Sequence, residues 1–324
     1  MKAIVYERYG SPDVLRFEDV DPARPTADQV LVRVMAAAPN PWDWHFMRGE
    51  PYLARILSGL RRPRTQTIPG SDVAGVVEAV GEQVRGFRPG DEVYGFVGFG
   101  GFAELLAVDP DRLAPKPANL SFEQAAAVPL AALTALQGLR DHGRLKWGQK
   151  VMVNGAAGGV GTFAVQIARA MGAEVTGVTS TRNVEMVRSI GATRVVDYIS
   201  QDMFDTDQRY DMVLDNVGNH DASDWRRVMT RGGVFVPVAG RQPISNWLVP
   251  VPHGLRLAWT SMLGRPEAGF TVKHAAGDLR FLTELIETGL ITPVIDTKFS
   301  LDGVAEAMTV LEAGHVRGKL VVTV

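Results

Sequence analysis

The sequence of 324 residues contains no cysteine. Disulfide bonds, thiolate nucleophiles and metal sites with cysteine ligands are therefore excluded, whereas the redox compartment is left open. Long apolar runs are also missing. The most apolar late stretch, residues 247–263, is broken by two prolines, a histidine and an arginine. It is too short and too polar to span a bilayer, so we expect no integral membrane segment.

An excess of charge of either sign is lacking too. The net charge is −2 and the isoelectric point is near 6.3, so no basic field exists to attract a nucleic acid or an anionic membrane. The N-terminal segment MKAIVYERYG alternates like a strand and lacks the apolar run of a signal peptide, which predicts a cytoplasmic protein. The composition is that of a soluble globular chain, and its length predicts two domains.

The sequence has two parts with different patterns of hydrophobic residues. Up to about residue 110, short β-type runs are separated by turn residues, a pattern typical of an antiparallel barrel or sandwich. The runs are KAIVYE, QVLVRVMAAA, VAGVVEAVG, DEVYGFV and FAELLAV. From Ser121, which forms a capping-box pattern with Gln124, the chain becomes apolar at helical spacing.

Beyond residue 150, strand-like and helical segments alternate. Helices are expected near 160–171, 183–190 and 222–229, among the strands KVMVNG, AEVTGVT, TRVVDY, YDMVLDNV and GGVFVPVAG. The alternation predicts βαβ units, and therefore a doubly wound parallel sheet with helices on both faces. The tail has helices near 276–288 and 302–313 and strands near 295–299 and at KLVVTV, and we expect it to return to the first domain.

A loop nearly without side chains, NGAAGGVG at 154–161, joins a predicted strand to a predicted helix. Gly155, Gly158 and Gly161 are spaced three apart, and Ala156-x-Gly158-x-x-Gly161 is the dinucleotide fingerprint with alanine in its first position. Small residues permit a tight turn and let backbone N–H groups and the helix dipole approach a pyrophosphate. The alternative is an ordinary tight turn, but the strand before and the helix after supply the context of the fingerprint.

The end of the next strand discriminates between the two dinucleotides. An NAD site places a carboxylate there, on the ribose 2′-hydroxyl. This chain has VTSTRN at 178–183, where Ser180 and Arg182 offer a hydroxyl and a guanidinium, groups that suit a 2′-phosphate. We therefore predict NADPH as the cofactor. The alternative is that Ser180 only caps the following helix and Arg182 is solvated.

Taken together, the motifs resemble the medium-chain dehydrogenase/reductase superfamily, in its zinc-free quinone oxidoreductase-like branch. The resemblance covers nearly the whole chain. It is carried by NPWDWHFMRGE (40–50), PGSDVAGVVEAVG (69–81), GGFAELLAV (100–108), AAVPLAALTAL (126–136), NGAAGGVGTFAVQIA (154–168), VTSTRN, IGATRVVDY (190–198), LDNVG (214–218) and HVRGKLVV (315–322). It implies a GroES-like catalytic domain at 1–121, completed by 265–324, and a Rossmann NADPH-binding domain at 122–264.

The resemblance also bears on metals. Zinc-dependent relatives bind a catalytic metal through a cysteine near position 40 and a histidine–glutamate pair near positions 71 and 72. This chain has Asn40, Ser71 and Asp72 there, and its six histidines show no metal-ligand spacing. We expect no metal site.

The resemblance assigns cofactor roles to individual residues. Gly158, Gly159 and Val160 are expected under the pyrophosphate. The expected 2′-phosphate, adenosine-ribose and nicotinamide contacts are, in that order, Ser180, Arg182 and Tyr198; Val217 and Gly218; and Gly240 with Thr134. Lys319 is expected to close over the cofactor from the tail. Two alternatives stay open: Tyr198 packs at a strand end, and Lys319 starts a strand in solvent.

For the reacting substrate, two catalytic residues are predicted. Asn40 is expected to contact the nicotinamide ribose or the substrate. Tyr52 is either a general acid or a wall of the pocket, in which case water protonates the product. Tyr52 lies in an arginine-rich segment, 52–66, which is either a solvated rim or attracts an acidic substrate or a membrane surface.

The leading functional hypothesis is a metal-independent, NADPH-dependent reductase of quinones or of the C=C bond of α,β-unsaturated carbonyl compounds. One alternative is a carbonyl reductase or alcohol dehydrogenase, which the lack of a Lewis acid disfavours. Another is a non-catalytic NADPH-binding protein. The resemblance further implies a homodimer.

Overall fold

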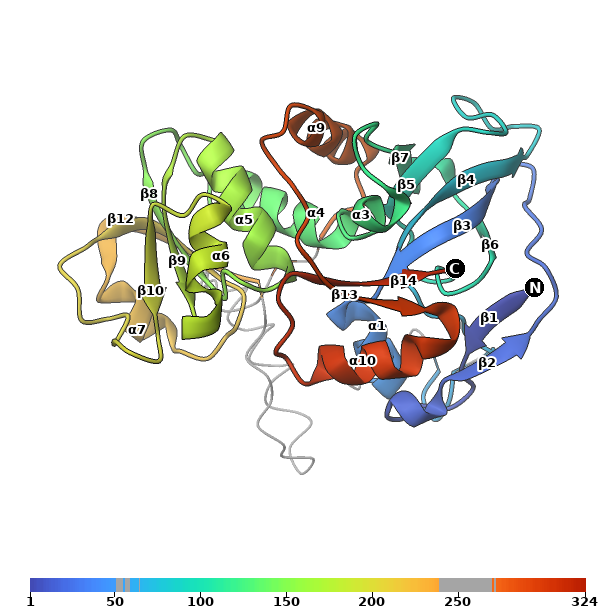
Figure 1. Ribbon diagram of the computed structural model, residues 1–324, viewed down its shortest axis with the longest axis horizontal. Helices are drawn as coiled ribbons and strands as arrows, with labels where there is room; N and C mark the ends of the chain where they lie inside the picture. Colours follow the sequence, from blue (N-terminus) through green and yellow to red (C-terminus); the bar gives the residue numbers. More distant parts are fainter. Residues whose placement is uncertain (51–54, 56–58, 64, 239–269, 271) are drawn as a thin grey trace. The chain divides into compact units, whose positions relative to one another are not determined.

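The computed structural model describes residues 1–50, 55, 59–63, 65–238, 270 and 272–324 (Figure 1). The chain forms two compact units. The first comprises Met1–Leu133 together with Lys273–Val324, and the second comprises Thr134–Val272. Among the described residues, no helix is long and apolar enough to cross a membrane.

The first unit is built on antiparallel strands. A small sheet pairs β1 (Lys2–Val5) with β2 (Arg16–Asp19). The larger sheet has the order β13-β14-β3-β4-β5-β7, and β6 also pairs with β3. Its strands are β3 (Val30–Ala38), β4 (Asp72–Val80), β5 (Glu92–Phe96), β6 (Leu105–Val108), β7 (Leu113–Pro115), β13 (Ile295–Ser300) and β14 (Lys319–Thr323). The β-rich first domain predicted from the sequence is thereby confirmed.

Strand β3 shows why this sheet forms. Val30, Val32 and Val34 alternate into the core, whereas Arg33 between them is exposed, as expected for a strand with one buried face. The tail strand β14 pairs antiparallel with β3, opposite Ala36 and Ala37. Strand β14 thus adds the tail to the sheet of the first unit.

The first unit also contains helices and 3₁₀ turns. Its helices are α1 (Pro41–Arg48), α3 (Phe122–Ala126), α9 (Ala276–Glu287) and α10 (Val304–Glu312), with 3₁₀ turns at Pro12–Val14, Pro110–Arg112 and Leu301–Gly303. Helix α1 begins with Pro41 at its first position and ends at Gly49 in the left-handed region (φ 63°). The predicted capping box of α3 is present, because Gln124 N donates to Ser121 Oγ and Ser121 N donates to Gln124 Oε1.

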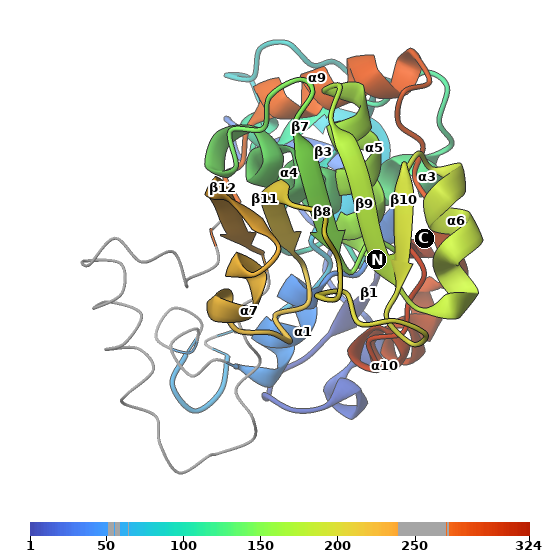
Figure 2. The same cartoon turned by 90° about the vertical axis from the view of Figure 1, so that its left-hand side faces the viewer.

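The second unit contains a five-stranded parallel sheet of the Rossmann type (Figure 2). Its strands, in the order β10-β9-β8-β11-β12, are β8 (Lys150–Asn154), β9 (Glu174–Thr179), β10 (Arg194–Asp197), β11 (Tyr210–Asp215) and β12 (Met229–Pro237). Helices α5 (Gly159–Ala170), α6 (Val184–Ser189) and α7 (Ala222–Arg226) connect them, with a 3₁₀ turn at Thr181–Asn183. Helix α4 (Pro129–Gln137) begins in the first unit, whose N-terminal segment ends at Leu133, and continues in the second unit into a π-helical turn at Gly138–His142.

Strand order determines where this sheet can bind a ligand. The chain builds β8, β9 and β10 outward in one direction and then continues on the other side of β8 with β11 and β12. The order therefore reverses between β8 and β11, and ligands of such sheets bind outside the carboxyl ends of the strands at that switch point.

Candidate functional site

The carboxyl ends of β8 and β11 meet at the switch point through a buried side-chain pair. Asn154 Nδ2 donates to Asp215 Oδ1 over 2.8 Å, and the same oxygen accepts from the backbone N–H groups of Val217 and Gly218, each at 3.0 Å. Asp215 is 1% exposed, whereas Val217 is 43% exposed. Asp215 thus shapes the loop that carries two predicted cofactor residues. Sequence reasoning missed this role, although an aspartate that ends a buried strand is a usable signal.

The glycine loop after β8 has different steric demands at different glycines. Gly155 adopts φ 73°, and a Cβ on Gly161 would lie 2.0 Å from Gly155 O, so both are required by the turn and by the close approach of α5. At Gly158, the nearest protein atom to a Cβ would be Gly155 O at 3.6 Å, an ordinary contact. The protein itself therefore does not need a glycine at Gly158, whereas a ligand lying against this backbone does.

The start of α5 supplies the charge complement for such a ligand. Gly158 is the N-cap residue, and without a side chain it cannot cap the first turn, which contains Gly159 and Val160. Uncapped N–H groups at a helix start, together with the positive end of the helix dipole, bind phosphate. The loop and helix start fit the pyrophosphate of a dinucleotide.

The ends of β9 and β10 bring the predicted 2′-phosphate residues to one edge of the sheet. Ser180 is half-buried and Arg182 is exposed in the 3₁₀ turn after β9. Tyr198 follows β10, is 52% exposed, and its N–H donates to Thr179 O. The three side chains therefore come from adjacent strand ends.

A carboxylate that sequence reasoning overlooked lies at the same edge. Asp197, the last residue of β10, accepts from Thr181 Oγ1 over 2.7 Å and from Ile199 N over 3.0 Å. The hydrogen bond from Thr181 is the main cause that lowers the pKa of Asp197. The expectation that no acid follows β9 is correct for that strand, but the neighbouring strand supplies one whose oxygens hold the local turns.

The remaining predicted cofactor and catalytic residues are placed as follows. Thr134 is buried in α4, one turn after Leu130. Tyr52 and Gly240 lie outside the described residues. Asn40 and Lys319 are both in the first unit and in contact with each other.

Asn40 and Lys319 belong to a buried polar cluster, whose members are at most 4% exposed: Asn40, Asp43, Ser71, Asp72 and Lys319. Strands β3, β4 and β14 bring its members together from three parts of the sequence. Ser71 Oγ donates to Asp43 Oδ2 (2.8 Å), and Lys319 Nζ lies 3.6 Å from Asp72 Oδ2. Sequence reasoning named four of these residues separately: Asn40 as a candidate catalytic residue, Ser71 and Asp72 as replacements of metal ligands, and Lys319 as a cofactor contact.

The amide of Asn40 is saturated inside this cluster. Its Nδ2 donates to Asp72 Oδ2 (2.8 Å) and Ser71 Oγ (3.0 Å), and its Oδ1 accepts from Lys319 Nζ. Because an ammonium only donates, the atom that faces it must be the amide oxygen. No donor of Asn40 is left over for a substrate in this arrangement.

Burial shifts the titration of the three ionisable members. Desolvation raises the pKa of Asp43 to about 7. Desolvation also raises the pKa of Asp72, to about 6, against the opposing charge of Lys319. The pKa of Lys319 is lowered by burial, and the charges of Asp72 and Asp43 act against this shift.

Three members of the cluster, Asn40, Ser71 and Asp72, stand at the positions that the family resemblance assigns to metal ligands in zinc-dependent relatives, but the donors of the cluster do not fit zinc. Zinc in proteins is held by cysteine, histidine and carboxylate. Here an amide, a hydroxyl and a carboxylate are hydrogen-bonded to one another, and the Lys319 ammonium already supplies a positive charge among them. Within the described part of the chain, no group of three or more histidine or acidic residues could hold a metal ion.

An aromatic cluster, which sequence reasoning also missed, lies beside the start of α1. Trp42 and Phe46 have ring centroids 4.7 Å apart, and Phe46 and Phe99 5.0 Å apart in an edge-on arrangement. Trp42 Nε1 donates to Gly98 O over 3.0 Å, and Phe99 remains 36% exposed. Each ring has a flat apolar face against which a planar group can stack. The density of aromatics in NPWDWHF was the available signal.

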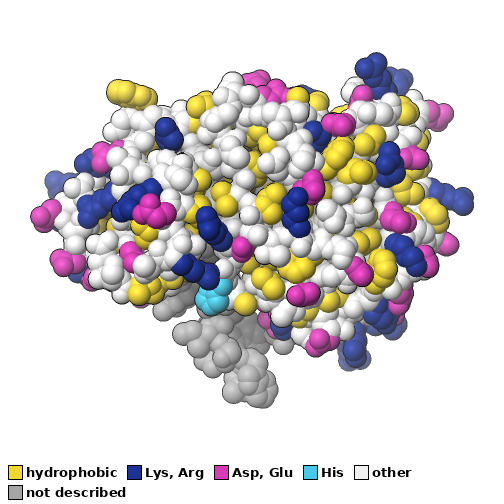
Figure 3. All heavy atoms as spheres, in the orientation of Figure 1, with side chains coloured by type: hydrophobic (Ala, Val, Ile, Leu, Met, Phe, Trp, Pro, Cys, Tyr) yellow, Lys and Arg dark blue, Asp and Glu magenta, His cyan; other side chains and the backbone are white. Residues whose placement is uncertain are grey.

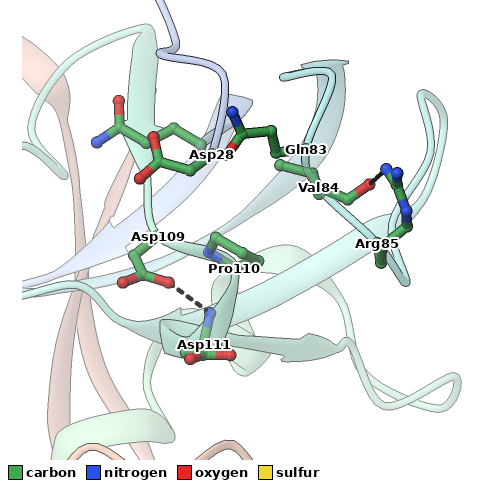
Figure 4. Close-up of a pocket in the computed structure, with 8 residues that line it drawn as sticks. Asp28, Gln83, Val84, Arg85, Asp109, Pro110 and Asp111 are labelled. Atoms are coloured by element: carbon green, nitrogen blue, oxygen red, sulfur yellow. Dashed lines mark hydrogen bonds between the residues drawn. The ribbon is translucent and has the colours of Figure 1, made fainter.

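Other surface features offer less chemistry. On the face shown in Figure 3, Lys and Arg side chains are interspersed with Asp and Glu. A pocket of the first unit (Figure 4) is lined by Asp28, Gln29, Gln83, Val84, Arg85, Asp109, Pro110 and Asp111. Its polar groups hold local turns, since Asp109 accepts from Asp111 N and Arg85 donates to Val84 O. None of the predicted site residues lines this pocket.

Comparison with known proteins places this geometry in context. Residues 26–118 match the family described as "Alcohol dehydrogenase GroES-like domain", and residues 190–322 match "Zinc-binding dehydrogenase". The chain is 37% identical to a 2-methylene-furan-3-one reductase of Solanum lycopersicum and 36% identical to a chloroplastic NADPH-dependent alkenal/one oxidoreductase of Arabidopsis thaliana; each alignment covers 99% of this chain and 79% of the relative. The solved quinone oxidoreductase from Coxiella burnetii is similar with a TM-score of 0.86 and 30% identity, over 100% of this chain and 99% of that one.

Proposed function

Since the chain belongs to the medium-chain dehydrogenase/reductase superfamily, in its quinone oxidoreductase-like branch, we propose that it reduces quinones or the C=C bond of α,β-unsaturated carbonyl compounds with NADPH and without a metal. The names of similar proteins support this substrate class, since they specify the reduction of a methylene-furanone, of alkenals or alkenones, and of quinones. The observation that carries the proposal is the buried cluster at the metal positions, where Lys319 stands among Asn40 and Asp72 in place of a Lewis acid.

NADPH supplies the hydride when it is bound. The backbone at Gly158, Gly159 and Val160 would hold its pyrophosphate, because Gly158 leaves room and α5 begins there without a side-chain cap. The 2′-phosphate would contact Ser180, Arg182 and Tyr198, and the adenosine ribose Val217 and Gly218. Thr134 and Gly240 would contact the nicotinamide end.

The choice of double bond follows from electrostatics. Hydride addition to an isolated ketone builds an alkoxide, which needs a metal or a strong acid beside it. The carboxylates of Asp43 and Asp72 are buried and engaged with Ser71, Asn40 and Lys319, so the cluster offers neither. Hydride addition to the β-carbon of an enone spreads the charge over an enolate, which then takes one proton from Tyr52 or from water.

Substrate contacts are proposed for the aromatic cluster of Trp42, Phe46 and Phe99, whose rings suit planar conjugated compounds. Asn40 lies two residues after the end of β3 and directly precedes α1, the helix that carries Trp42 and Phe46. Because the donors of its amide are all engaged, we propose that Asn40 acts by positioning α1, in place of the direct contact with the nicotinamide ribose or the substrate that is expected from the sequence.

Product analysis with stereospecifically deuterated NADPH tests the proposal. With an α,β-unsaturated ketone we expect a saturated ketone that carries deuterium at the β-carbon. An allylic alcohol with deuterium on its carbinol carbon would instead establish carbonyl reduction, and the lack of any turnover over a panel of quinones, enones and aldehydes would favour a non-catalytic NADPH-binding protein.

We infer further that the chain acts as a homodimer in the cytoplasm. The family resemblance supports the dimer, and the lack of cysteine and of a long apolar run is compatible with the location. Sedimentation equilibrium of the purified protein distinguishes a dimer from a monomer of 35.1 kDa. Cell fractionation tests the location, which is open because the relatives include a chloroplastic protein.

A further inference from the structure

The buried polar cluster touches the starts of two helices. Asn40 N donates to Asp43 Oδ2 over 2.8 Å in the first turn of α1. Asp72 Oδ1 accepts from the backbone N–H of Leu130 over 3.0 Å, at the second residue of α4. Because Pro129 has no N–H, Leu130 bears the first amide of α4. A carboxylate at this point satisfies an orphan donor and faces the positive end of the helix dipole.

The ammonium of Lys319 stabilises the Asp72 carboxylate in this buried site. Its Nζ donates to Asn40 Oδ1 and to Pro39 O (3.4 Å) and lies 3.6 Å from Asp72 Oδ2. The three protons of the ammonium thus face three oxygens of the first unit, and the residue is only 4% exposed. A buried carboxylate that loses its cationic partner is strongly destabilised, so the position of Asp72 depends on Lys319.

We propose that Lys319 is a positioning residue, which holds the Asp72 carboxylate against the start of α4 and thereby sets the position of Thr134, one turn further along the helix. The link from Thr134 to NADPH rests on the proposed function. The rival assignment is the one expected from the sequence, in which Lys319 itself contacts the cofactor. The two assignments can be distinguished, because Lys319 acts through Asp72 in the first and independently of Asp72 in the second.

The first experiment measures α4 directly, without cofactor or substrate. Lys319→Met removes the charge and keeps most of the side-chain length. We expect amide hydrogen exchange in the first turn of α4, at Leu130 above all, to become at least about tenfold faster, while α5 keeps its protection. Lys298→Met is the matched control, because Lys298 lies on the neighbouring strand β13 and pairs with Glu123 at 3.1 Å on the surface. It should leave both helices unchanged.

The second experiment is a double-mutant cycle on NADPH affinity, read from the quenching of protein fluorescence. We expect Lys319→Met and Asp72→Asn each to weaken binding about tenfold, and the double variant to bind no more weakly than either single variant. Such non-additivity shows that Lys319 acts through Asp72. The double variant removes the charges of Lys319 and Asp72 together. If Lys319→Met alone does not fold, hydrogen exchange is measured on the double variant in its place.

Two outcomes would overturn the positioning role. One is unchanged exchange of α4 in Lys319→Met. The other is a loss of NADPH affinity on Lys319→Met that is equally large with and without Asp72→Asn, which indicates direct contact with the cofactor. Failure of the wild-type protein to reduce quinones or enones would overturn the proposed function and leave the exchange result standing.

Discussion

Thr181 Oγ1 donates a hydrogen bond to Asp197 Oδ2 over 2.7 Å and so ties the turn after β9 to the end of β10. This contact places Arg182, the residue after Thr181, beside the strand end that carries Tyr198. It also places a carboxylate near the residues predicted to bind a 2′-phosphate. We therefore expect the preference for NADPH at this edge to depend on the guanidinium of Arg182.

Replacement of that guanidinium tests the preference. Charge-assisted hydrogen bonds are worth roughly 1.5–3 kcal/mol, and about 1.4 kcal/mol corresponds to a factor of ten in affinity. Arg182→Ala is therefore expected to weaken NADPH binding by about 10- to 100-fold and to leave NADH binding nearly unchanged. Titration of both cofactors measures this. Arg188→Ala, on the exposed face of α6 and paired with Glu185, is the control. Equal loss for both cofactors would show that Arg182 is structural.

Replacement by alanine should destabilise the protein much more at Gly161 than at Gly158, although both glycines belong to one loop. Gly161→Ala places a Cβ 2.0 Å from Gly155 O, so the helix or the turn must shift, at a cost of about 1–3 kcal/mol or more in the free energy of unfolding. Gly158→Ala meets only an ordinary contact at 3.6 Å and should cost about 1 kcal/mol or less.

Gly158→Ala, which should hardly change the stability, is expected to have a large effect on cofactor affinity. Its Cβ would occupy space that the pyrophosphate needs, so NADPH binding should weaken at least about tenfold in a protein that remains folded. Chemical denaturation and NADPH titration of the two variants check the pair. Full NADPH affinity in Gly158→Ala would show that this glycine does not contact the pyrophosphate.

The metal-free reaction has a direct chemical test. Asn40 is hydrogen-bonded to Ser71, to Asp72 and to Lys319, so we expect purified, active enzyme to lack stoichiometric zinc by elemental analysis. A strong chelator should leave the turnover rate unchanged. Stoichiometric zinc together with loss of activity on chelation would contradict the assignment of the cluster.

Asp43 should make the stability of the protein depend on pH in an unusual direction. Its folded-state pKa is raised to about 7, above the value near 4 of an unfolded chain, so between these values the folded state binds the extra proton. Stability from this group is therefore present at low pH and is lost as the pH rises toward 7. Asp72, with a pKa raised to about 6, acts in the same direction.

Comparison with a variant isolates the contribution of Asp43. Burial lowers the pKa of His45 and of His274, and both histidines oppose the carboxylates in this pH range. Their effect cancels when wild type and Asp43→Asn are unfolded with urea at the same pH. We expect the stability advantage of wild type to shrink between pH 5 and pH 8. An advantage that is constant or grows with pH would mean that Asp43 is ionised throughout.

Much of the architecture is determined by the sequence itself, because it rests on local patterns. The capping box of Ser121 and Gln124 begins α3 as predicted, and the alternation of strands and helices after residue 150 yields the parallel sheet. The glycine loop could be read for the same reason. A tight turn, a helix start and the space above them involve residues within eight positions of one another.

Only the tertiary structure brings together the buried polar cluster, and only the tertiary structure places Asp197 beside the turn after β9. Asn40 and Lys319 are 279 positions apart, and they meet because β14 returns to pair with β3. Asp197 reaches Thr181 because β10 pairs parallel with β9. Local propensity carries no information on which strands become neighbours or in which register. The conversion of a metal position into a lysine-centred network, and the hydrogen bonds that occupy every donor of Asn40, therefore became visible only in the folded chain.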